Sequence, residues 1–179
     1  ALVQVPDLHS WIAAMPSRLG DAAQQQIAGV QRPRGNLHFG ARTVRLNEPQ
    51  IMGILNVTPD SFSDGGKHGD PQAAIDAGFA MATEGAAIVD VGGESTRPGA
   101  PLVWEGDEIK RVEPVIAALA KGGVATSVDT RKAAVMEAAL AAGASLINDI
   151  SALRYDERAL AVVAAATCPV VLMHAPSAK

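Results

Sequence analysis

The chain has 179 residues, of which 48% are hydrophobic and 19% charged, and its formal net charge is -4. This composition is that of a folded domain with a sizeable core and excludes a disordered chain. The negative charge provides no basic face for nucleic acid or an anionic membrane, and no stretch approaches the ~20 apolar residues that span a bilayer. The first residues lack the features of a signal peptide, and the single cysteine, Cys168, fits a reducing, cytoplasmic compartment.

The N-terminal residues 1–35 are predicted to be an appendage, to which the sequence assigns no chemistry. Apolar spacing indicates one helix around Ile12 and a second over residues 21–30. Residues 36–48 are predicted to form a β-hairpin, because apolar and polar residues alternate on both sides of a turn at Gly40.

Five short apolar runs alternate with helical patterns from residue 51 onward. The runs alternate poorly in polarity, which is typical of strands buried on both faces of a parallel sheet. We therefore predict strands over Ile51–Val57, Ala87–Val91, Ala125–Val128, Ser145–Ile150 and Val170–Met173.

Four helices are predicted between these strands. Asp70 and Pro71 are expected to supply the N-cap and the first residue of the first helix. Pro114 lies within the second and must kink it or delay its start. The third ends at Gly143. The residues expected to turn toward the core in the fourth are Leu160, Val163 and Ala166.

This alternation of strand and helix is typical of parallel α/β folds with right-handed crossovers. Two architectures remain open on these grounds, an open doubly wound sheet and a (β/α)8 barrel. Each unit takes about 25 residues, so eight units would need about 200, consistent with the barrel. The chain holds about five such units.

Polar residues recur where the predicted strands end. Any one of them would be read as a cap or turn residue. In succession they indicate a ligand-binding edge, because both candidate folds bind ligands at the carboxyl ends of their strands. Carboxylates and amides there would suit a flat, amino-substituted heterocycle. The residues are Asn56, Asp90, Asp129, Asn148 with Asp149, and His174.

Two loops follow the first two strands. Residues 58–66 are polar, end in glycine and carry Phe62, which is typical of a mobile active-site loop or of a plain surface loop. In residues 92–99, Thr96 and Arg97 either bind an anion or belong to a turn with a solvated arginine. No dinucleotide-binding or P-loop glycine pattern occurs in the sequence.

Several of these segments together resemble dihydropteroate synthases, in the order and at the spacing of that family. The resemblance covers roughly residues 37–176 and implies a (β/α)8 barrel, of which residues 36–179 hold an N-terminal hairpin and about the first five β/α units. The segments are IMGILNVTPDSFSDGG, IVDVGGESTRPGA, SVDTRKA, INDI and LMH.

The resemblance implies a transferase of folate biosynthesis. Such an enzyme condenses 7,8-dihydropterin-6-ylmethyl diphosphate with 4-aminobenzoate, gives dihydropteroate and diphosphate, uses Mg²⁺ and is a target of sulfonamides. It also implies residue roles: Asp129, Arg97 and Asp64 are expected to be catalytic, and Asn56 to meet the magnesium diphosphate. The expected substrate-binding residues are Thr96, Asp90, Asp129, Asn148, Ile150, Met173, Phe62 and Pro98.

Other readings stay open. His174 matches a family histidine for which a structural hydrogen bond and a catalytic role are equally plausible. The family's later lysine and Ser-x-Arg-x-x-His motif have no counterpart before Lys179, so we expect this chain alone to be inactive and to lack the usual homodimer interface. The alternatives are a pterin-binding methyltransferase, or a non-catalytic half-barrel that binds a partner chain.

Overall fold

The computed structural model describes residues 5–39, 42–58, 71–95, 97 and 99–173. The chain divides into two units, Ala1–Gly35 and Asn36–Lys179. In the first, helices α1 (Val5–Ala13) and α2 (Ser17–Gln31) form a helical hairpin. The helices can approach closely at Gly20 because this residue has no Cβ. A Cβ added there would lie 3.1 Å from the carbonyl oxygen of Ile12. The two helices predicted for this segment are confirmed.

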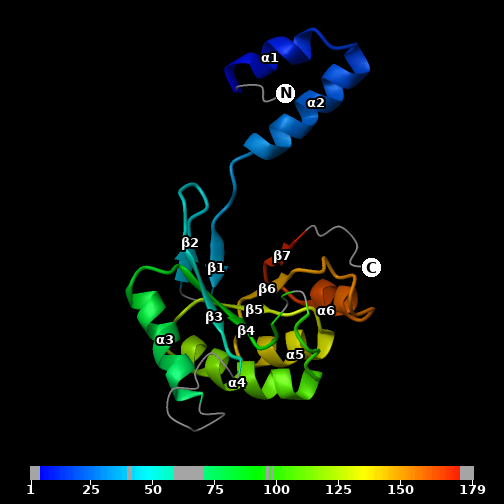
Figure 1. Ribbon diagram of the computed structural model, residues 1–179. Coiled ribbons are helices and arrows are strands. Elements are labelled where there is room, and N and C mark those ends of the chain that lie inside the picture. The colour runs from blue at the N-terminus through cyan, green and yellow to red at the C-terminus, as the bar shows by residue number, and fades with distance from the viewer. Residues whose placement is uncertain (1–4, 40–41, 59–70, 96, 98, 174–179) are drawn as a thin grey trace. The chain divides into compact units, whose positions relative to one another are not determined.

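The second unit is built on a five-stranded parallel sheet whose strand order is the chain order, β3-β4-β5-β6-β7 (Figure 1). A doubly wound sheet reverses direction at a switch point, whereas a (β/α)8 barrel adds each strand beside the last. The order therefore identifies a partial barrel. The strands are β3 (Met52–Asn56), β4 (Ile88–Gly92), β5 (Thr126–Asp129), β6 (Leu146–Asp149) and β7 (Val170–Leu172).

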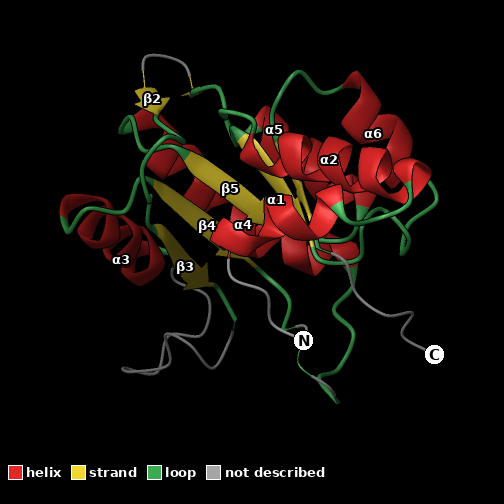
Figure 2. Ribbon diagram, turned by 90° about the horizontal axis from the view of Figure 1, so that it is seen from above, coloured by secondary structure: helices red, strands yellow, loops and turns green. Residues whose placement is uncertain are grey.

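Four helices connect these strands and lie along one side of the sheet (Figures 1 and 2). Consecutive helices pack on each other, α3 on α4, α4 on α5 and α5 on α6. Three of these helices are followed by a glycine, because Gly85, Gly123 and Gly143 have φ of +112°, +79° and +106°, which favour a residue without a Cβ. The helices are α3 (Gln72–Thr83), α4 (Glu105–Lys121), α5 (Ala133–Ala141) and α6 (Ala159–Ala165).

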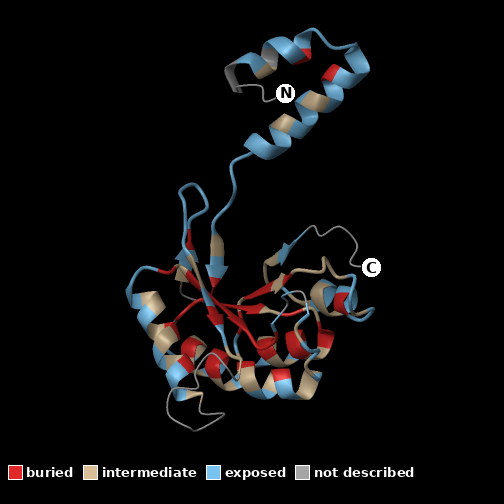
Figure 3. Cartoon of the chain, in the orientation of Figure 1, coloured by how far each residue is buried: buried red, intermediate tan, exposed pale blue. Residues whose placement is uncertain are grey.

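The register of the strands separates two faces. Leu55, Val91, Val128 and Ile147 are register partners across β3 to β6, and all four are buried against the helices (Figure 3). Successive side chains of a strand point to opposite faces, so the neighbouring residues face away from the helices. That second face is open at the first strand, where Ile54 is 66% exposed.

A short antiparallel hairpin closes the amino end of the sheet. It consists of β1 (Leu37–Phe39) and β2 (Arg42–Val44), as predicted for this segment, although Gly40 lies outside the described residues. Phe39 and Val44 pack on residues at or just before the start of three strands of the sheet. The members of this second cluster are Phe39, Val44, Ile88, Ala125 and Leu146. The carboxyl end is thus the side left for a ligand.

Three details of the predicted helices are wrong or open. Leu160 is 64% exposed, because the buried side of α6 begins one residue earlier, at Ala159. Pro71 occupies the N-cap of α3 rather than its first turn, and Asp70 lies outside the described residues. The helix containing Pro114 is not delayed, since α4 begins nine residues before it, at Glu105. Among the described residues, no helix has the length and apolarity to cross a membrane.

Candidate active site at the carboxyl end of the sheet

One register row on the open face carries polar groups. Asn56, Gly92, Asp129 and Asn148 are successive partners at the carboxyl ends of β3 to β6. The strands place them side by side because each ends at the same level of the sheet. A Cβ on Gly92 would lie 3.5 Å from Asp129 Cβ and 3.7 Å from Asn56 Oδ1. Glycine therefore leaves room between the amide and the carboxylate.

Asp90 lies one layer deeper than predicted. It sits in the middle of β4, where its register partners are Ile54 and Ser127, and it does not end the strand. The side chain is buried, and its Oδ2 accepts a hydrogen bond of 2.9 Å from Asn148 Nδ2. An ionised carboxylate can only accept hydrogen bonds. Asp90 therefore fixes the orientation of the Asn148 amide, with Nδ2 toward Asp90, and leaves Asn148 Oδ1 to accept from another donor.

Asp129 is a carboxylate without a complete set of partners. Its Oδ1 is buried and has no hydrogen-bond partner among the described residues, and the same holds for Asp90 Oδ1. Burial raises the pKa of Asp129 from 3.8 to about 6, helped by the nearby carboxylates of Asp90, Glu108 and Asp149. A buried acceptor of this kind is costly unless a ligand donates to it.

Asp149, next to Asn148 in sequence, has a structural task. Its Oδ1 accepts from the backbone N–H and the hydroxyl of Ser151 at 2.6 and 2.7 Å, and its Oδ2 accepts from the N–H of Leu153 at 2.9 Å. These bonds hold a turn in which Ala152 and Leu153 have positive φ. The neighbouring Ile150 is half-buried, and Met173, just beyond β7, is 45% exposed.

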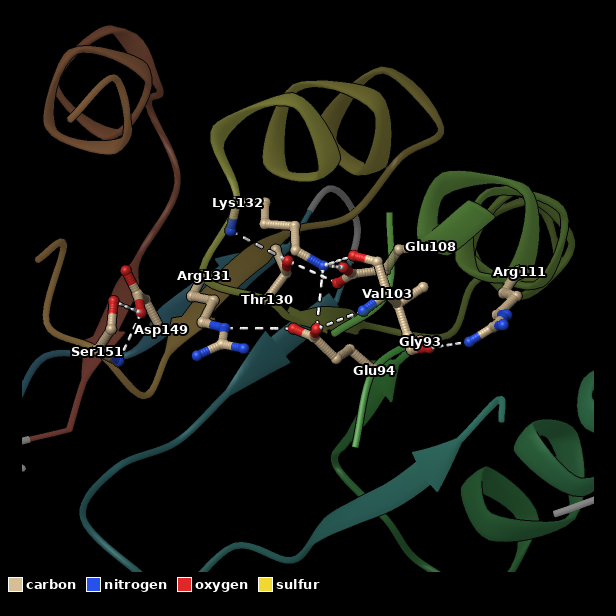
Figure 4. A network of polar contacts seen from close by, with 10 residues as sticks. All are labelled: Gly93, Glu94, Val103, Glu108, Arg111, Thr130, Arg131, Lys132, Asp149 and Ser151. Carbon is tan, nitrogen blue, oxygen red and sulfur yellow. Dashed lines mark hydrogen bonds and ion pairs between the residues drawn. The ribbon is translucent and has the colours of Figure 1, made fainter. Parts of the chain in front are cut away.

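A buried ionic network that the sequence reasoning missed joins the loop after β4 to the start of α5 (Figure 4). Lys132 pairs with Glu108 at 2.6 Å and with Glu94 at 3.2 Å, and Arg131 pairs with the other oxygen of Glu94 at 3.2 Å. Thr130 Oγ1 donates to Glu108 at 2.7 Å. One signal was present in the sequence: Glu108 precedes Val112, Ile116 and Leu119 at helical spacing, and all four are buried.

The other predicted site residues divide into two groups. Arg97 is described and exposed, in the loop between β4 and α4. The remainder lie outside the described residues, so the structure neither brings them together nor separates them. They are Phe62, Asp64, Thr96, Pro98 and His174.

The described residues offer few ligands for a magnesium ion. No group of three or more His, Cys, Asp or Glu side chains suited to a metal occurs among the residues that the structure describes. Asn56, exposed at the end of β3, offers one amide oxygen, which is a ligand type that Mg²⁺ accepts. Since Mg²⁺ keeps several waters and leans on substrate phosphates, one such oxygen fits the ion as a single protein ligand.

Several known proteins are similar to this chain in sequence and fold. The chain is 53% identical over 125 residues to the dihydropteroate synthase of Bacillus subtilis, a match that covers 69% of this chain and 44% of that protein. The structure of Xanthomonas albilineans dihydropteroate synthase with 4-aminobenzoic acid superposes with a TM-score of 0.75 at 52% identity, covering 79% of this chain and 52% of that one.

The same enzyme of Xanthomonas albilineans in complex with 7,8-dihydropteroate gives a TM-score of 0.70 at 48% identity, with 79% of this chain and 52% of that one covered. The chain thus spans about half the length of the curated relatives it matches. The family model described as pterin binding enzyme matches residues 52–179, which includes every strand of the sheet and the whole polar row. The chain therefore belongs to the pterin binding enzyme family.

Proposed function

We propose that the protein acts as a dihydropteroate synthase, joining 7,8-dihydropterin-6-ylmethyl diphosphate to 4-aminobenzoate and releasing diphosphate. The observation that carries the proposal is the polar row on the open face, with the unpartnered buried oxygen of Asp129. The similarity to relatives of that name supports it.

Recognition of the pterin is proposed to rest on two neighbouring acceptors. Asp129 offers Oδ1, and Asn148 offers Oδ1 because its Nδ2 is held by Asp90 at 2.9 Å. A pterin carries an exocyclic amino group beside ring nitrogens, and so presents N–H donors along one edge of a flat ring. Donors at that edge would satisfy both oxygens and remove the cost of burying them.

The chemistry requires no protein nucleophile. As diphosphate departs, positive charge develops on the methylene and spreads into the pterin ring. The buried carboxylate of Asp90 and the half-buried carboxylate of Asp129 favour an electron-poor ring at this position. The guanidinium of Arg97 is proposed to stabilise the departing diphosphate, since arginine matches phosphate geometry. Asp64 is the third proposed catalytic residue, on the strength of the resemblance alone.

The proposal assigns further contacts. Ile150 and Met173 form apolar walls for the pterin, and Thr96, Phe62 and Pro98 contact the substrates from the two loops. Asn56 would hold Mg²⁺, which when bound to diphosphate supplies positive charge for the leaving group. We assign these roles to residues 36–179, with residues 1–35 as an appendage.

The cellular setting also follows from the proposal. The cytoplasm suits a protein with one cysteine, Cys168, and no pair to oxidise. Within a whole protein, a homodimer like that of the family is proposed, and sulfonamides would compete with 4-aminobenzoate.

Calorimetric titration tests the pterin site. A dihydropterin diphosphate analogue with Mg²⁺ is titrated into this chain and into a completed barrel, meaning this chain followed by the C-terminal half that its relatives have. Asp129→Asn should abolish binding, because the amide NH2 group would replace a carboxylate oxygen and so face an N–H donor of the pterin. Asp107→Asn is the matched control, since Asp107 is exposed in a surface pair with Lys110.

Product formation completes the test. The completed barrel should make dihydropteroate from the two substrates, and Asp129→Asn should not. Binding that survives Asp129→Asn would contradict the assigned pterin site. Binding of the pterin without formation of dihydropteroate would favour another pterin reaction, such as methyl transfer.

A further inference from the structure

Lys132 is a buried cation only three positions beyond Asp129. It is 6% exposed, and its Nζ lies 2.6 Å from Glu108 Oε2 and 3.2 Å from Glu94 Oε1. The same nitrogen donates to the backbone carbonyl of Val103 at 2.6 Å. Two of the ammonium's three donors thus bond to Val103 and Glu108, and Glu94 Oε1 lies at ion-pair distance (Figure 4).

These contacts fasten both ends of the loop between β4 and α4. Glu94 follows β4 and Val103 precedes α4. The N–H of Val103 donates to Glu94 Oε1 at 3.0 Å, so the two ends are bonded to each other as well as to Lys132. Arg97 lies between them and is exposed. The positions that Arg97 can take are therefore limited by the buried contacts of Lys132 with the two ends of the loop.

The negative charge of Glu94 is balanced by the positive charges of Arg131 and Lys132. Burial alone would raise the pKa of this carboxyl, but the Val103 N–H, Arg131 and Lys132 together lower it below its ordinary value. Glu108, which is fully buried, takes the Thr130 hydroxyl on its other oxygen. Well-packed apolar side chains often stabilise a fold as well as a buried ion pair does, so stability alone gives no reason for charges here.

We propose that Lys132 and Glu94 are positioning residues that hold Arg97 at the diphosphate of the pterin substrate, an inference that rests on the function proposed above. Neither side chain has to touch a substrate. Lys132 holds the two ends of the loop in place, and the loop in turn fixes the position of Arg97. Since the same lysine is the N-cap of α5, three residues after β5 ends, the arginine is positioned relative to the strand that carries Asp129.

A double-mutant cycle in the completed barrel tests this. Glu94→Gln loosens the loop but leaves the buried pair of Lys132 and Glu108 intact, so the variant should fold. We expect Glu94→Gln to raise the KM for the pterin diphosphate about tenfold and to change the KM for 4-aminobenzoate less than about twofold. In an Arg97→Ala background, Glu94→Gln should have almost no further effect.

Two more variants sharpen the cycle. Lys132→Arg keeps the cation and should retain most of the affinity for pterin diphosphate, whereas Lys132→Met should behave like Glu94→Gln. Lys110→Met is the control, because Lys110 belongs to an exposed pair on the same helix as Glu108. Thermal unfolding of every variant is measured alongside the kinetics.

The outcomes separate cleanly. Effects of Glu94→Gln and Arg97→Ala that multiply would overturn the positioning role, as would a loss that follows the melting temperature and affects both KM values equally. A wild-type barrel that makes no dihydropteroate would overturn the proposed function and this inference together. An active wild type with multiplying effects would overturn this inference alone.

Discussion

Replacing Asp129 by Asn should stabilise the folded chain, and increasingly so as the pH rises. The pKa of Asp129 is raised by burial and by neighbouring carboxylates from 3.8 to about 6. Between these values the native state holds a proton that the unfolded chain has lost, so the free energy of unfolding falls as the pH rises. A difference of about two pH units corresponds to about 3 kcal/mol, which solvent on the open face screens to about 1.5–3 kcal/mol.

The measurement is urea unfolding followed by circular dichroism at pH 5 and pH 8. The gain of Asp129→Asn over the wild type should grow by about 1 kcal/mol between these two values, with an unchanged m-value. Asp149→Asn is the control of opposite sign. It should destabilise the chain by about 1–3 kcal/mol at both values, because it disturbs the acceptors of three part-buried hydrogen bonds.

A gain that is equal at pH 5 and pH 8 would refute the reasoning, as would a loss at pH 8. Either result would mean that the surroundings of Asp129 do not disfavour its ionised form. A positive result would show that the residue proposed to read the pterin is retained at a cost in stability, which is a common property of binding sites.

Two further predictions concern the site and the core. Binding of a pterin diphosphate at pH 6 should release up to about half a proton, because donors at Asp129 favour its charged form, and calorimetry in two buffers of different ionisation enthalpy measures this; no release of protons at pH 6 would contradict it. Gly78→Ala should cost about 1–3 kcal/mol in urea unfolding, because its Cβ would lie 2.7 Å from Leu119 Cδ1. Gly29→Ala, with nothing within 4 Å, should instead gain about 0.5–1 kcal/mol, and equal effects of the two changes would refute the packing argument.

The alternation of strands and helices was predictable because each element carries its own periodicity. All five strands were found within a residue or two of their expected ends. The lateral order of the strands was not predictable from periodicity, since a local pattern does not record which strand lies beside which. It took the family resemblance to favour the barrel, and the order observed in the sheet confirms it.

The errors arose where neighbouring positions compete. In α6, Ala159 and Leu160 are adjacent apolar residues, and the smaller one is buried because α6 packs closely on α5. The ionic network was missed for a related reason. A charged residue on a helix is ordinarily solvated, and Glu108 is buried only because Lys132 reaches it from another segment. Distant pairs of this kind are invisible until the chain is folded.

The strand order has a consequence for how the protein is made. From β4 onward, each strand of the five-stranded sheet pairs with the strand synthesised just before it, so none of them has to wait for a later partner. Pairing between consecutive units costs less loop-closure entropy than pairing between segments farther apart in the chain. On the ribosome, the sheet can therefore grow one unit at a time in the order of translation, with the helix of each unit covering the apolar face as it emerges.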